Sequence, residues 1–386
     1  MTDSQPPRTP SAPPPGTFEI LAADPSSSAR AGRLWTAHGP IDTPVFMPVG
    51  TQGTVKALAP WELEEMDCRV ILGNTYHLNL RPGMEVMEEM GGLHAFSDWH
   101  RAILTDSGGY QVFSLTDLRE MTPDGVWFRS HLDGSRLFMG PRESMRIQRI
   151  LASDIAMAFD ECPPCPCTEE YAAQAVQRTI DWAAACSREP RAPGQLRFAI
   201  VQGGVYPALR ARCAEALLAL PGYEGYAIGG VSVGEPDALI LPGVEMTVAH
   251  LPPDRPRYLM GVGQFHQMAE SVARGVDMFD CVMPTRLARH GMAFTRAGRI
   301  NLKNAANRTA SAPVEEGCTC PACRRFSRAY VRHLLMAREI LGIRILALHN
   351  IHRYLETMRE MRQSILDGTF PAFRARIAAA YGPPAS

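Results

Sequence analysis

The sequence has almost no lysine, since Lys56 and Lys303 are its only two. It also lacks any run of about 18 apolar residues, the length that a membrane-spanning helix needs. The first residues contain no apolar core of the kind found in secretory signal peptides. These absences predict a cytoplasmic protein without membrane segments. Its ten cysteines are then expected to be free thiols, catalytic groups or metal ligands rather than disulfides.

Net charge is also small, at −1, which argues against a protein that binds nucleic acid over its whole surface. Residues 282–344 differ, because they carry twelve Arg or Lys against three acidic residues, a balance of +9. Phosphate groups would be attracted to such a segment. A genomic preference for arginine explains the choice of arginine over lysine but not its clustering. The segment therefore predicts contact with nucleic acid.

The remaining composition is that of a globular protein, with 46% hydrophobic and 20% charged residues in a chain of 386. Residues 1–16 stand apart, because they contain six prolines and almost no apolar side chains. Such a segment cannot bury enough surface to fold, so a disordered tail is predicted there. The rest of the chain is long enough for one large domain or two medium ones.

Eight short apolar runs, many of them separated by helix-like stretches, dominate the middle of the chain. They are residues 45–50, 70–74, 102–107, 154–161, 197–202, 226–234, 257–263 and 277–283. This alternation is typical of a parallel sheet covered by helices on both faces. It predicts an α/β protein, and eight units favour a (β/α)8 TIM barrel with its site at the carboxyl ends of the strands. A doubly wound open sheet would give a similar pattern.

Polar or glycine residues end most of these runs. They are Asn74, Asp106, Asp160, Glu161, Gln202, Gly229, Gly230, Gly261, Gly263 and Asp280. Any one of them could be a turn or a helix cap, which for a single aspartate is the commoner role. Their joint placement favours a functional site at one end of the barrel. Before the barrel, residues 18–42 are predicted to form an added hairpin region.

Residues 284–349 interrupt the barrel pattern with basic and cysteine-rich sequence, and a closing helix is predicted over 350–368. Within the interruption, "CTCPAC" spaces three cysteines so that they can bind one tetrahedral metal ion. The fourth ligand could be His333, His349 or His352, and spacing alone does not choose among them. Four protein ligands would make a zinc ion structural, whereas an open position would make it catalytic.

A second cysteine group, "CPPCPC", follows the fourth apolar run and contains Cys162, Cys165 and Cys167. Its prolines stiffen the turn, and no further histidine or cysteine follows closely. We interpret it as a loop at the barrel mouth, with Cys162 lining a pocket, rather than as a second metal site.

Several stretches together resemble the bacterial-type tRNA-guanine transglycosylases: "ILTDSGGYQVFSL", "SHLDGS", "MAFDECPP", "VQGG", "YAIGGVSVGE", "YLMGVG", "GVDMFDCVMPTR", and "CTCPACRR" with "LHNI". The resemblance implies that residues 17–386 form a single catalytic domain, an irregular TIM barrel with an inserted zinc-binding subdomain at about residues 284–349. It also implies one structural zinc ion held by Cys318, Cys320, Cys323 and His349.

The resemblance further implies the reaction, which is that of a pentosyltransferase. Guanine at the wobble position of tRNAs with G-U-N anticodons would be exchanged for 7-aminomethyl-7-deazaguanine, a step in queuosine biosynthesis. These tRNAs accept aspartate, asparagine, histidine and tyrosine. Exchange without breaking the backbone suits a double displacement through a covalent enzyme–RNA intermediate. Similar enzymes are homodimers, and we expect the same here.

The resemblance also assigns roles to individual residues. Asp280 would be the nucleophile, and Asp106 the general acid and base, oriented by Asn74 and Gln111. The base would be bound by Ser107, Tyr110, Asp160, Cys162, Gln202, Gly229, Gly230, Val231, Glu235, Met260 and Gly261. Arg286 and Arg289 would contact the tRNA.

Two rival functions make different predictions. A zinc-ribbon RNA-binding protein without catalysis, such as a partner subunit, would lack the nucleophile, whereas this chain has both Asp280 and Asp106. A barrel hydrolase that uses its metal directly would need an open coordination position at the cysteine cluster.

Overall fold

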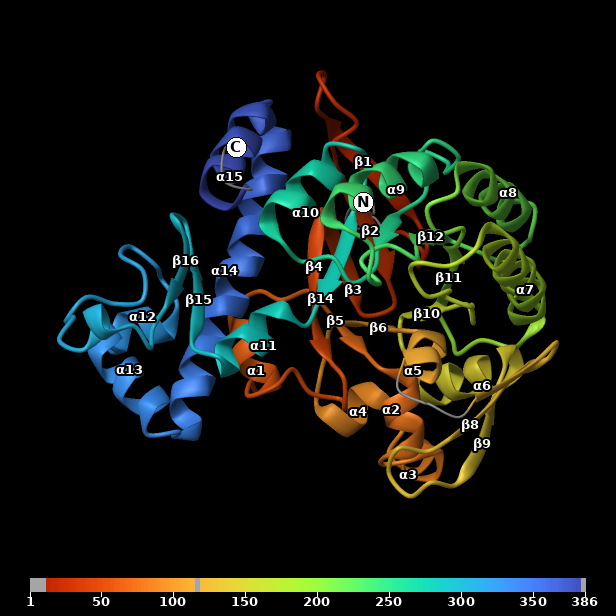
Figure 1. The fold of residues 1–386 in the computed structure, drawn as a ribbon, viewed down its shortest axis with the longest axis horizontal. Helices are drawn as coiled ribbons and strands as arrows, with labels where there is room; N and C mark the ends of the chain where they lie inside the picture. Colours follow the sequence, from red (N-terminus) through yellow and green to blue (C-terminus); the bar gives the residue numbers. More distant parts are fainter. Residues whose placement is uncertain (1–11, 115–118, 383–386) are drawn as a thin grey trace, which may run out of the picture.

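The computed structural model describes residues 12–114 and 119–382, and Figure 1 shows a closed barrel of parallel strands at its centre. The barrel strands are β4 (Val45–Gly50), β5 (Val70–Gly73), β6 (Ala102–Thr105), β10 (Ile155–Met157), β11 (Leu196–Val201), β12 (Gly225–Ile228), β13 (Arg257–Leu259) and β14 (Met278–Cys281). Each overlaps one predicted apolar run. Closure is made by β14 and β4, where Asp280 pairs with Met47. The predicted TIM barrel is therefore confirmed, and the open sheet is excluded.

Helices surround the barrel. They are α1 (Pro60–Glu65), α2 (Thr75–Leu80), α3 (Met84–Glu89), α4 (Leu93–Ser97), α5 (Gly109–Ser114), α6 (Pro141–Leu151), α7 (Glu169–Arg188), α8 (Pro207–Leu218), α9 (Ile240–Val248) and α10 (Phe265–Val272), with a short 3-10 helix η1 (Asp237–Leu239) before α9. Local sequence sets their starts. Thr168, for example, caps α7 by accepting a hydrogen bond from the Tyr171 amide at 3.3 Å, and Pro141 begins α6.

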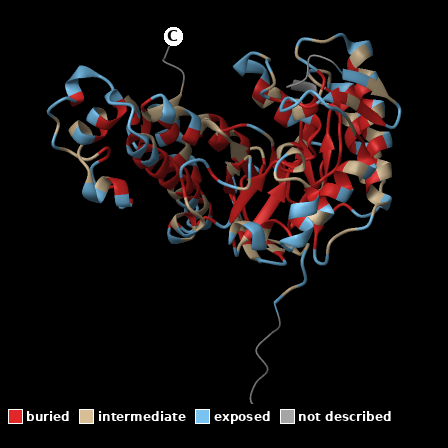
Figure 2. Ribbon diagram, turned by 90° about the horizontal axis from the view of Figure 1, so that it is seen from below, coloured by how far each residue is buried: buried red, intermediate tan, exposed pale blue. Residues whose placement is uncertain are grey.

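Successive side chains of each strand point to opposite faces, and this produces two apolar clusters. On β5, Val70 and Leu72 point into the barrel, while Ile71 points outward against the helices. The barrel interior is thus packed with side chains. Figure 2 shows that residues along the strands are buried. The outer faces of the helices are largely exposed.

A three-stranded antiparallel sheet precedes the barrel and consists of β1 (Phe18–Ala23), β2 (Arg30–Thr36) and β3 (Gly39–Thr43). Its Leu34 and Ile41 join the apolar cluster of the barrel interior, so this sheet covers one end of the barrel. The expected hairpin region at residues 18–42 is confirmed. Residues 1–11 of the predicted tail lie outside the described residues.

A second small sheet was not predicted. It lies between α5 and α6 and consists of β7 (Arg119–Thr122), β8 (Gly125–Arg129) and β9 (Arg136–Met139) in antiparallel pairs.

The chain leaves the barrel after β14. It then forms α11 (Met283–Arg289), β15 (Met292–Thr295), β16 (Gly298–Asn301), η2 (Ala305–Asn307), α12 (Pro321–Arg325), α13 (Arg328–Met336), α14 (Ile340–Leu366) and α15 (Phe370–Tyr381). Figure 1 shows β15, β16, α12 and α13 together at one side, with the 27-residue α14 leading from them back to the barrel. Among the helices of the described residues, none has the length and apolar character needed to cross a membrane.

Candidate active site and metal centre

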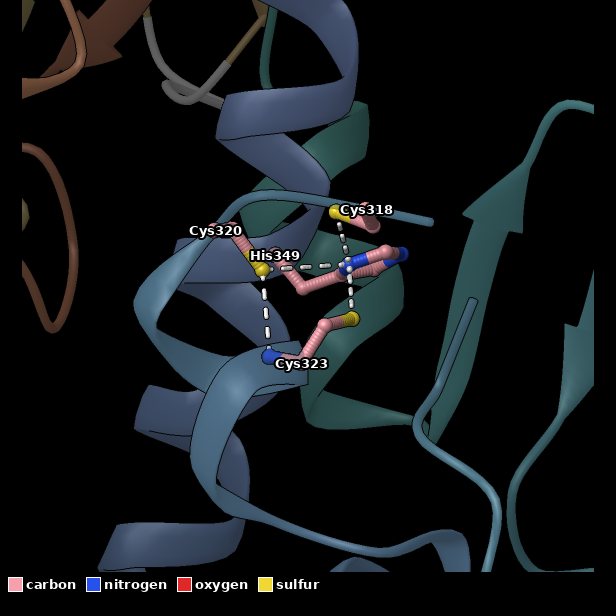
Figure 3. Close-up of side chains that lie close together, drawn as sticks. All are labelled: Cys318, Cys320, Cys323 and His349. Carbon is pink, nitrogen blue, oxygen red and sulfur yellow. Dashed lines mark hydrogen bonds between the residues drawn. The ribbon is translucent and has the colours of Figure 1, made fainter. Parts of the chain in front are cut away.

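Three cysteines and one histidine converge beside α14 (Figure 3). The Nδ1 atom of His349 lies 3.8, 3.6 and 3.4 Å from the sulfur atoms of Cys318, Cys320 and Cys323. Tetrahedral bonds of about 2.0–2.1 Å to nitrogen and 2.3 Å to sulfur would separate these atoms by about 3.6 Å. The four side chains therefore fit one tetrahedral metal ion.

The orientation of His349 supports the same conclusion. Its Nε2 lies 2.8 Å from the carbonyl oxygen of Phe294 on β15, where an N–H group can donate. The proton is thereby fixed on Nε2, and the lone pair of Nδ1 faces the thiols. On the other side, Cys320 caps α12 and its sulfur accepts the Cys323 amide at 3.3 Å. The side chains of His349 and Cys320 are thus held by backbone groups around them.

The other candidate histidines do not join this group. His352 lies 3.4 Å from the Thr319 hydroxyl and 3.8 Å from the Glu356 carboxylate, and His333 belongs to α13. Within the described part of the chain, Cys162, Cys165 and Cys167 also bring no ligand atoms together around one point. This agrees with the interpretation of "CPPCPC" as a loop.

Asp106 follows β6 and is surrounded by uncharged donors. Its Oδ2 accepts hydrogen bonds from Asn74 Nδ2 at 2.6 Å and Gln111 Nε2 at 3.0 Å, and its Oδ1 accepts the Thr75 amide at 2.9 Å. Burial raises the pKa of Asp106 to about 7, and the negative charge of Asp280 contributes to the rise. Asp106 can therefore gain or lose a proton near neutral pH.

Asp280 lies on β14 and is held through one oxygen. Its Oδ1 accepts the Tyr258 hydroxyl at 2.6 Å and the Gly261 amide at 2.8 Å. No hydrogen bond joins Oδ2 to the described residues, so this oxygen is available to a bound molecule. Burial raises the pKa of Asp280 above the ordinary value of an aspartate.

A third carboxylate, Asp160, ends the segment after β10. Its Oδ1 accepts the Ser107 hydroxyl at 2.9 Å, and its Oδ2 accepts Gln202 Nε2 at 2.7 Å. Burial raises the pKa of Asp160 to about 6. The Oε1 atom of Gln202 is buried without a hydrogen-bond partner in the described structure, as is Oε1 of Gln111. Unpaired buried acceptors of this kind indicate a site that a polar ligand completes.

The backbone after β12 forms one wall of this site. A side chain at Gly229 would lie 2.5 Å from Gln202 Nε2, and Gly230 has a φ of +60° that favours glycine. Further along, the Glu235 carboxylate accepts the backbone amides of Ser232 and Val233. Val231, between these groups, is buried.

The other predicted base-binding residues lie around the same strand ends. Cys162 is half-buried, and burial raises the pKa of its thiol to about 12, so it remains protonated. Tyr110, on α5, is 49% exposed, whereas Met260 packs partly against the barrel interior. Gly261, with a φ of +75°, presents its amide to Asp280.

The remaining predicted residues, Arg286 and Arg289, are exposed on α11, directly after the strand that carries Asp280. A cavity of about 850 Å³ lies elsewhere, between α10 and α15, and its lining includes His266, Arg299 and Arg374. None of the predicted base-binding residues lines that cavity.

Sequence reasoning missed two residues that form hydrogen bonds with the candidate catalytic-site aspartates Asp280 and Asp106. Tyr258 donates to Asp280, and Thr75 supplies an amide to Asp106 Oδ1 and a hydroxyl to its carbonyl at 2.5 Å. Thr75 directly follows Asn74, so its place at a strand end was the available signal. Tyr258 had none, because a tyrosine inside an apolar run is ordinarily part of the core.

Comparison with known proteins gives a consistent result. The family model described as queuine tRNA-ribosyltransferase matches residues 24–383. Proteins named queuine tRNA-ribosyltransferase are similar over almost the whole chain. The one from Moorella thermoacetica is 53% identical over 352 residues, covering 91% of this chain and 94% of the relative. Those from Symbiobacterium thermophilum and Syntrophobacter fumaroxidans are 52% and 53% identical, covering 92% of this chain and 89% and 95% of the relatives. The chain therefore belongs to the queuine tRNA-ribosyltransferase family, and the predicted enzyme class, a pentosyltransferase, is confirmed.

Proposed function

We propose that the protein exchanges guanine at the wobble position of G-U-N anticodon tRNAs for 7-aminomethyl-7-deazaguanine, a step in queuosine biosynthesis. The names of its relatives support the tRNA substrate and the class of reaction. The observation that carries the proposed mechanism is the geometry of Asp280, which is anchored through Oδ1 and leaves Oδ2 unbonded by the described residues.

In the first half of the reaction, Oδ2 of Asp280 attacks C1′ of the ribose. The bond from C1′ to N9 breaks, and its electron pair moves onto the departing guanine. The two donors on Oδ1 fix the direction of attack, and the RNA stays covalently bound to the enzyme. In the second half, a nitrogen of the incoming base attacks C1′ and the Asp280 carboxylate is released.

Asp106 handles the proton of both bases. Its pKa of about 7 allows it to donate a proton to the departing guanine and then to accept one from the incoming base. Asn74 and Gln111 hold the carboxylate in place without fixing its charge, because both are neutral donors. The sum of the two half-reactions leaves Asp106 as it began.

The base pocket suits a guanine edge. Asp160 would accept the ring N–H and the exocyclic amine, while Gln202 and the Gly230 amide would serve the carbonyl oxygen. Ser107 and Gln202 already bind Asp160, so they orient its carboxylate before the base arrives. Tyr110 and Met260 would lie against the two faces of the flipped base.

The incoming base is proposed to carry an aminomethyl group. Glu235 and the Val231 carbonyl would bind its ammonium, because a cation beside a carboxylate and a carbonyl oxygen is favoured. Exchange assays with 7-aminomethyl-7-deazaguanine and queuine in competition test this choice. Preferential incorporation of queuine would contradict it.

The metal is proposed to be one structural zinc ion. All four ligands come from the protein, so the ion would hold residues 284–349 together and take no part in the exchange. His349→Ala should then lose zinc and unfold this unit, whereas a catalytic metal would lose turnover with the fold intact. Zinc analysis and circular dichroism distinguish the two results.

A homodimer is proposed because apolar side chains are exposed where α13 meets α14. Tyr330, Met336, Ile340 and Leu341 are 40%, 56%, 79% and 41% exposed. A second copy covering this patch would remove it from water. Ile340→Glu should yield monomers in sedimentation experiments. An unchanged mass would place the dimer contact elsewhere.

The wider assignments follow from the substrate. We propose that the enzyme acts in the cytoplasm, that Arg286 and Arg289 contact tRNA phosphates, and that residues 17–386 form one catalytic domain. Within it, residues 284–349 would be the zinc-binding subdomain and 350–368 the closing helix.

Labelled guanine tests the proposed function directly. The purified protein should incorporate it into unmodified tRNA with a G-U-N anticodon, and not into the same tRNA with an A-U-N anticodon. Failure to label the first tRNA, or equal labelling of both, would refute the proposal.

A further inference from the structure

A buried arginine lies behind the base pocket. Arg210 belongs to α8, and only 1% of its surface is exposed. Its Nη1 and Nη2 atoms donate to the carbonyl oxygens of Gly229 and Gly230, both at 3.1 Å. Its Nε donates to the Gly204 carbonyl at 2.7 Å. One guanidinium therefore joins two loops that follow neighbouring barrel strands.

The acceptors of this guanidinium are all uncharged. The fourth is the Thr247 hydroxyl of α9, at 3.1 Å from Nη1. Burial lowers the pKa of Arg210 to about 10, so the side chain is still protonated at neutral pH. A buried charge without an ionic partner destabilises a fold, and an apolar residue would fill the same space at lower cost. Packing alone therefore does not explain why a charged side chain occupies this position.

The two glycines need support from the protein because they have no side chains to fix them. On the pocket side they face Gln202, whose amide lies 2.5 Å from the position of a Cβ at either residue. Their carbonyl oxygens accept hydrogen bonds from Arg210. The peptide that carries the Gly230 amide is thus fixed by Arg210 through the carbonyl of Gly229, with Gln202 packed close to both glycines.

Arg210 also has an electrostatic effect on the base pocket. The positive charge of Arg210 acts on the thiol of Cys162, where it opposes the rise in pKa that burial causes. A departing purine gains negative charge as its bond to the ribose breaks. A fixed cation behind the pocket stabilises that charge without contacting the base.

We propose that Arg210 is a positioning residue of base exchange, which aims the Gly230 amide into the pocket and places a positive charge behind the bound base. The inference rests on the proposed function, because it assigns the base to the pocket formed by Asp160, Gln202 and Gly230. It adds a residue that touches neither the base nor the ribose.

Replacement of Arg210 by an uncharged residue tests the proposal. In Arg210→Met, kcat/KM for guanine should fall about 10- to 100-fold, as expected for loss of hydrogen bonds to a charged group. The KM for tRNA should stay within about twofold, because the RNA-binding surface is unchanged. Arg210→Lys keeps the charge but loses the fork of donors, so it should recover part of kcat/KM.

Arg197→Met is the matched control. Arg197 is also buried, with 2% exposure, and burial also lowers its pKa. It lies near the start of β11, whereas Gln202 and Gly204 follow the end of that strand, and it donates to the Glu189 carbonyl at 2.9 Å. This variant should retain kcat/KM for guanine per folded molecule. Equal losses in both arginine variants would show a general effect on folding and overturn the proposal.

The outcomes separate this inference from the proposed function. If wild-type protein incorporates no guanine, the proposed function itself fails. If wild-type protein is active and folded Arg210→Met matches it in kcat/KM for guanine, the role of Arg210 is refuted. Should Arg210→Met fail to fold, Arg210→Lys decides: full wild-type kcat/KM for guanine would refute the positioning role, and a selective loss for guanine would support it.

Discussion

The two ends of the barrel both contain buried aspartates, but they surround them with different partners. At the carboxyl end, Asp106 and Asp160 accept hydrogen bonds from amides and hydroxyls, and burial raises their pKa values to about 7 and 6. At the amino end, Asp277 binds Arg30 through both carboxylate oxygens, at 2.9 and 2.6 Å. Burial raises the pKa of Asp277 as well, but the hydrogen bonds and the positive charge of Arg30 oppose that rise. The carboxyl end therefore surrounds its aspartates with neutral donors, whereas the amino end pairs Asp277 with a cation.

Asp154, which directly precedes β10, is a second buried aspartate at the amino end of the barrel. It lies between His38 and His94, at 2.9 and 3.2 Å, and the two histidine rings stack with centroids 3.7 Å apart. It also accepts the backbone amide of Ile103 at 2.8 Å. Despite burial, these partners hold the pKa of Asp154 well below its usual range. We interpret this end of the barrel as structural, and we propose that the other end carries the chemistry.

The largest effect on activity is expected at the carboxyl end of the barrel. Asp280→Asn removes the proposed nucleophile, so guanine exchange should fall about 10⁴-fold or more. The free energy of unfolding should change by less than about 1 kcal/mol, since no ion pair is lost. Exchange kinetics and urea denaturation measure the two quantities. Exchange at near wild-type rate would refute the role of Asp280.

The reverse result is expected at the opposite end. Asp277→Asn leaves Arg30 buried without its anion, so the free energy of unfolding should fall by about 3–5 kcal/mol. The kcat/KM of the folded fraction should be unchanged. A stable variant with impaired exchange would remove the distinction between the two ends.

A third test concerns the pH dependence of base exchange. In the proposed mechanism protonated Asp106 donates a proton to the departing base, so kcat/KM for tRNA should decline above pH about 7. Gln111→Met removes a donor that favours the carboxylate, which should raise the pKa of Asp106 and move this decline to higher pH. The control is Gln174→Met, the same change at an exposed position on α7. A decline that stays in place or moves to lower pH would contradict the assignment.

The smallest effect is expected for His38. Its hydrogen bond to Asp154 raises its pKa, so its contribution to stability is complete below the unfolded pKa of about 6.5 and disappears as pH rises through the folded value. His38→Ala should therefore lower the free energy of unfolding by about 0.5–1 kcal/mol at pH 5.5 and by less at pH 9. His290→Ala, on an exposed residue, should show no such trend. Equal losses at both pH values would exclude a charged His38.

The barrel could be predicted from the sequence because strands buried on both faces are continuous apolar runs. The sheet of β7, β8 and β9 could not, because its strands are partly exposed and carry charged residues such as Arg119 and Arg136, so they form no continuous apolar runs. For the metal centre, spacing gave three ligands and a choice of histidines. The resemblance selected His349, and the structure places it with the cysteines.

The partners of the site residues were harder to predict. Tyr258 lies in a strand where an apolar role is the usual one, and only its hydroxyl reaches Asp280. Arg210 lies on a helix whose sequence carries no sign that its guanidinium reaches the loop after β12. Such contacts join residues far apart in the sequence, so they depend on the closed barrel rather than on any local pattern.

The most direct test of the central claim is to locate the covalent bond between enzyme and RNA. The protein would be mixed with G-U-N tRNA without free base, denatured, digested with ribonuclease and trypsin, and examined by mass spectrometry. Trypsin releases residues 275–286 as one peptide that contains both Asp277 and Asp280, one aspartate from each end of the barrel. We predict a ribose adduct on Asp280. An adduct on another residue, or none while exchange proceeds, would contradict the account.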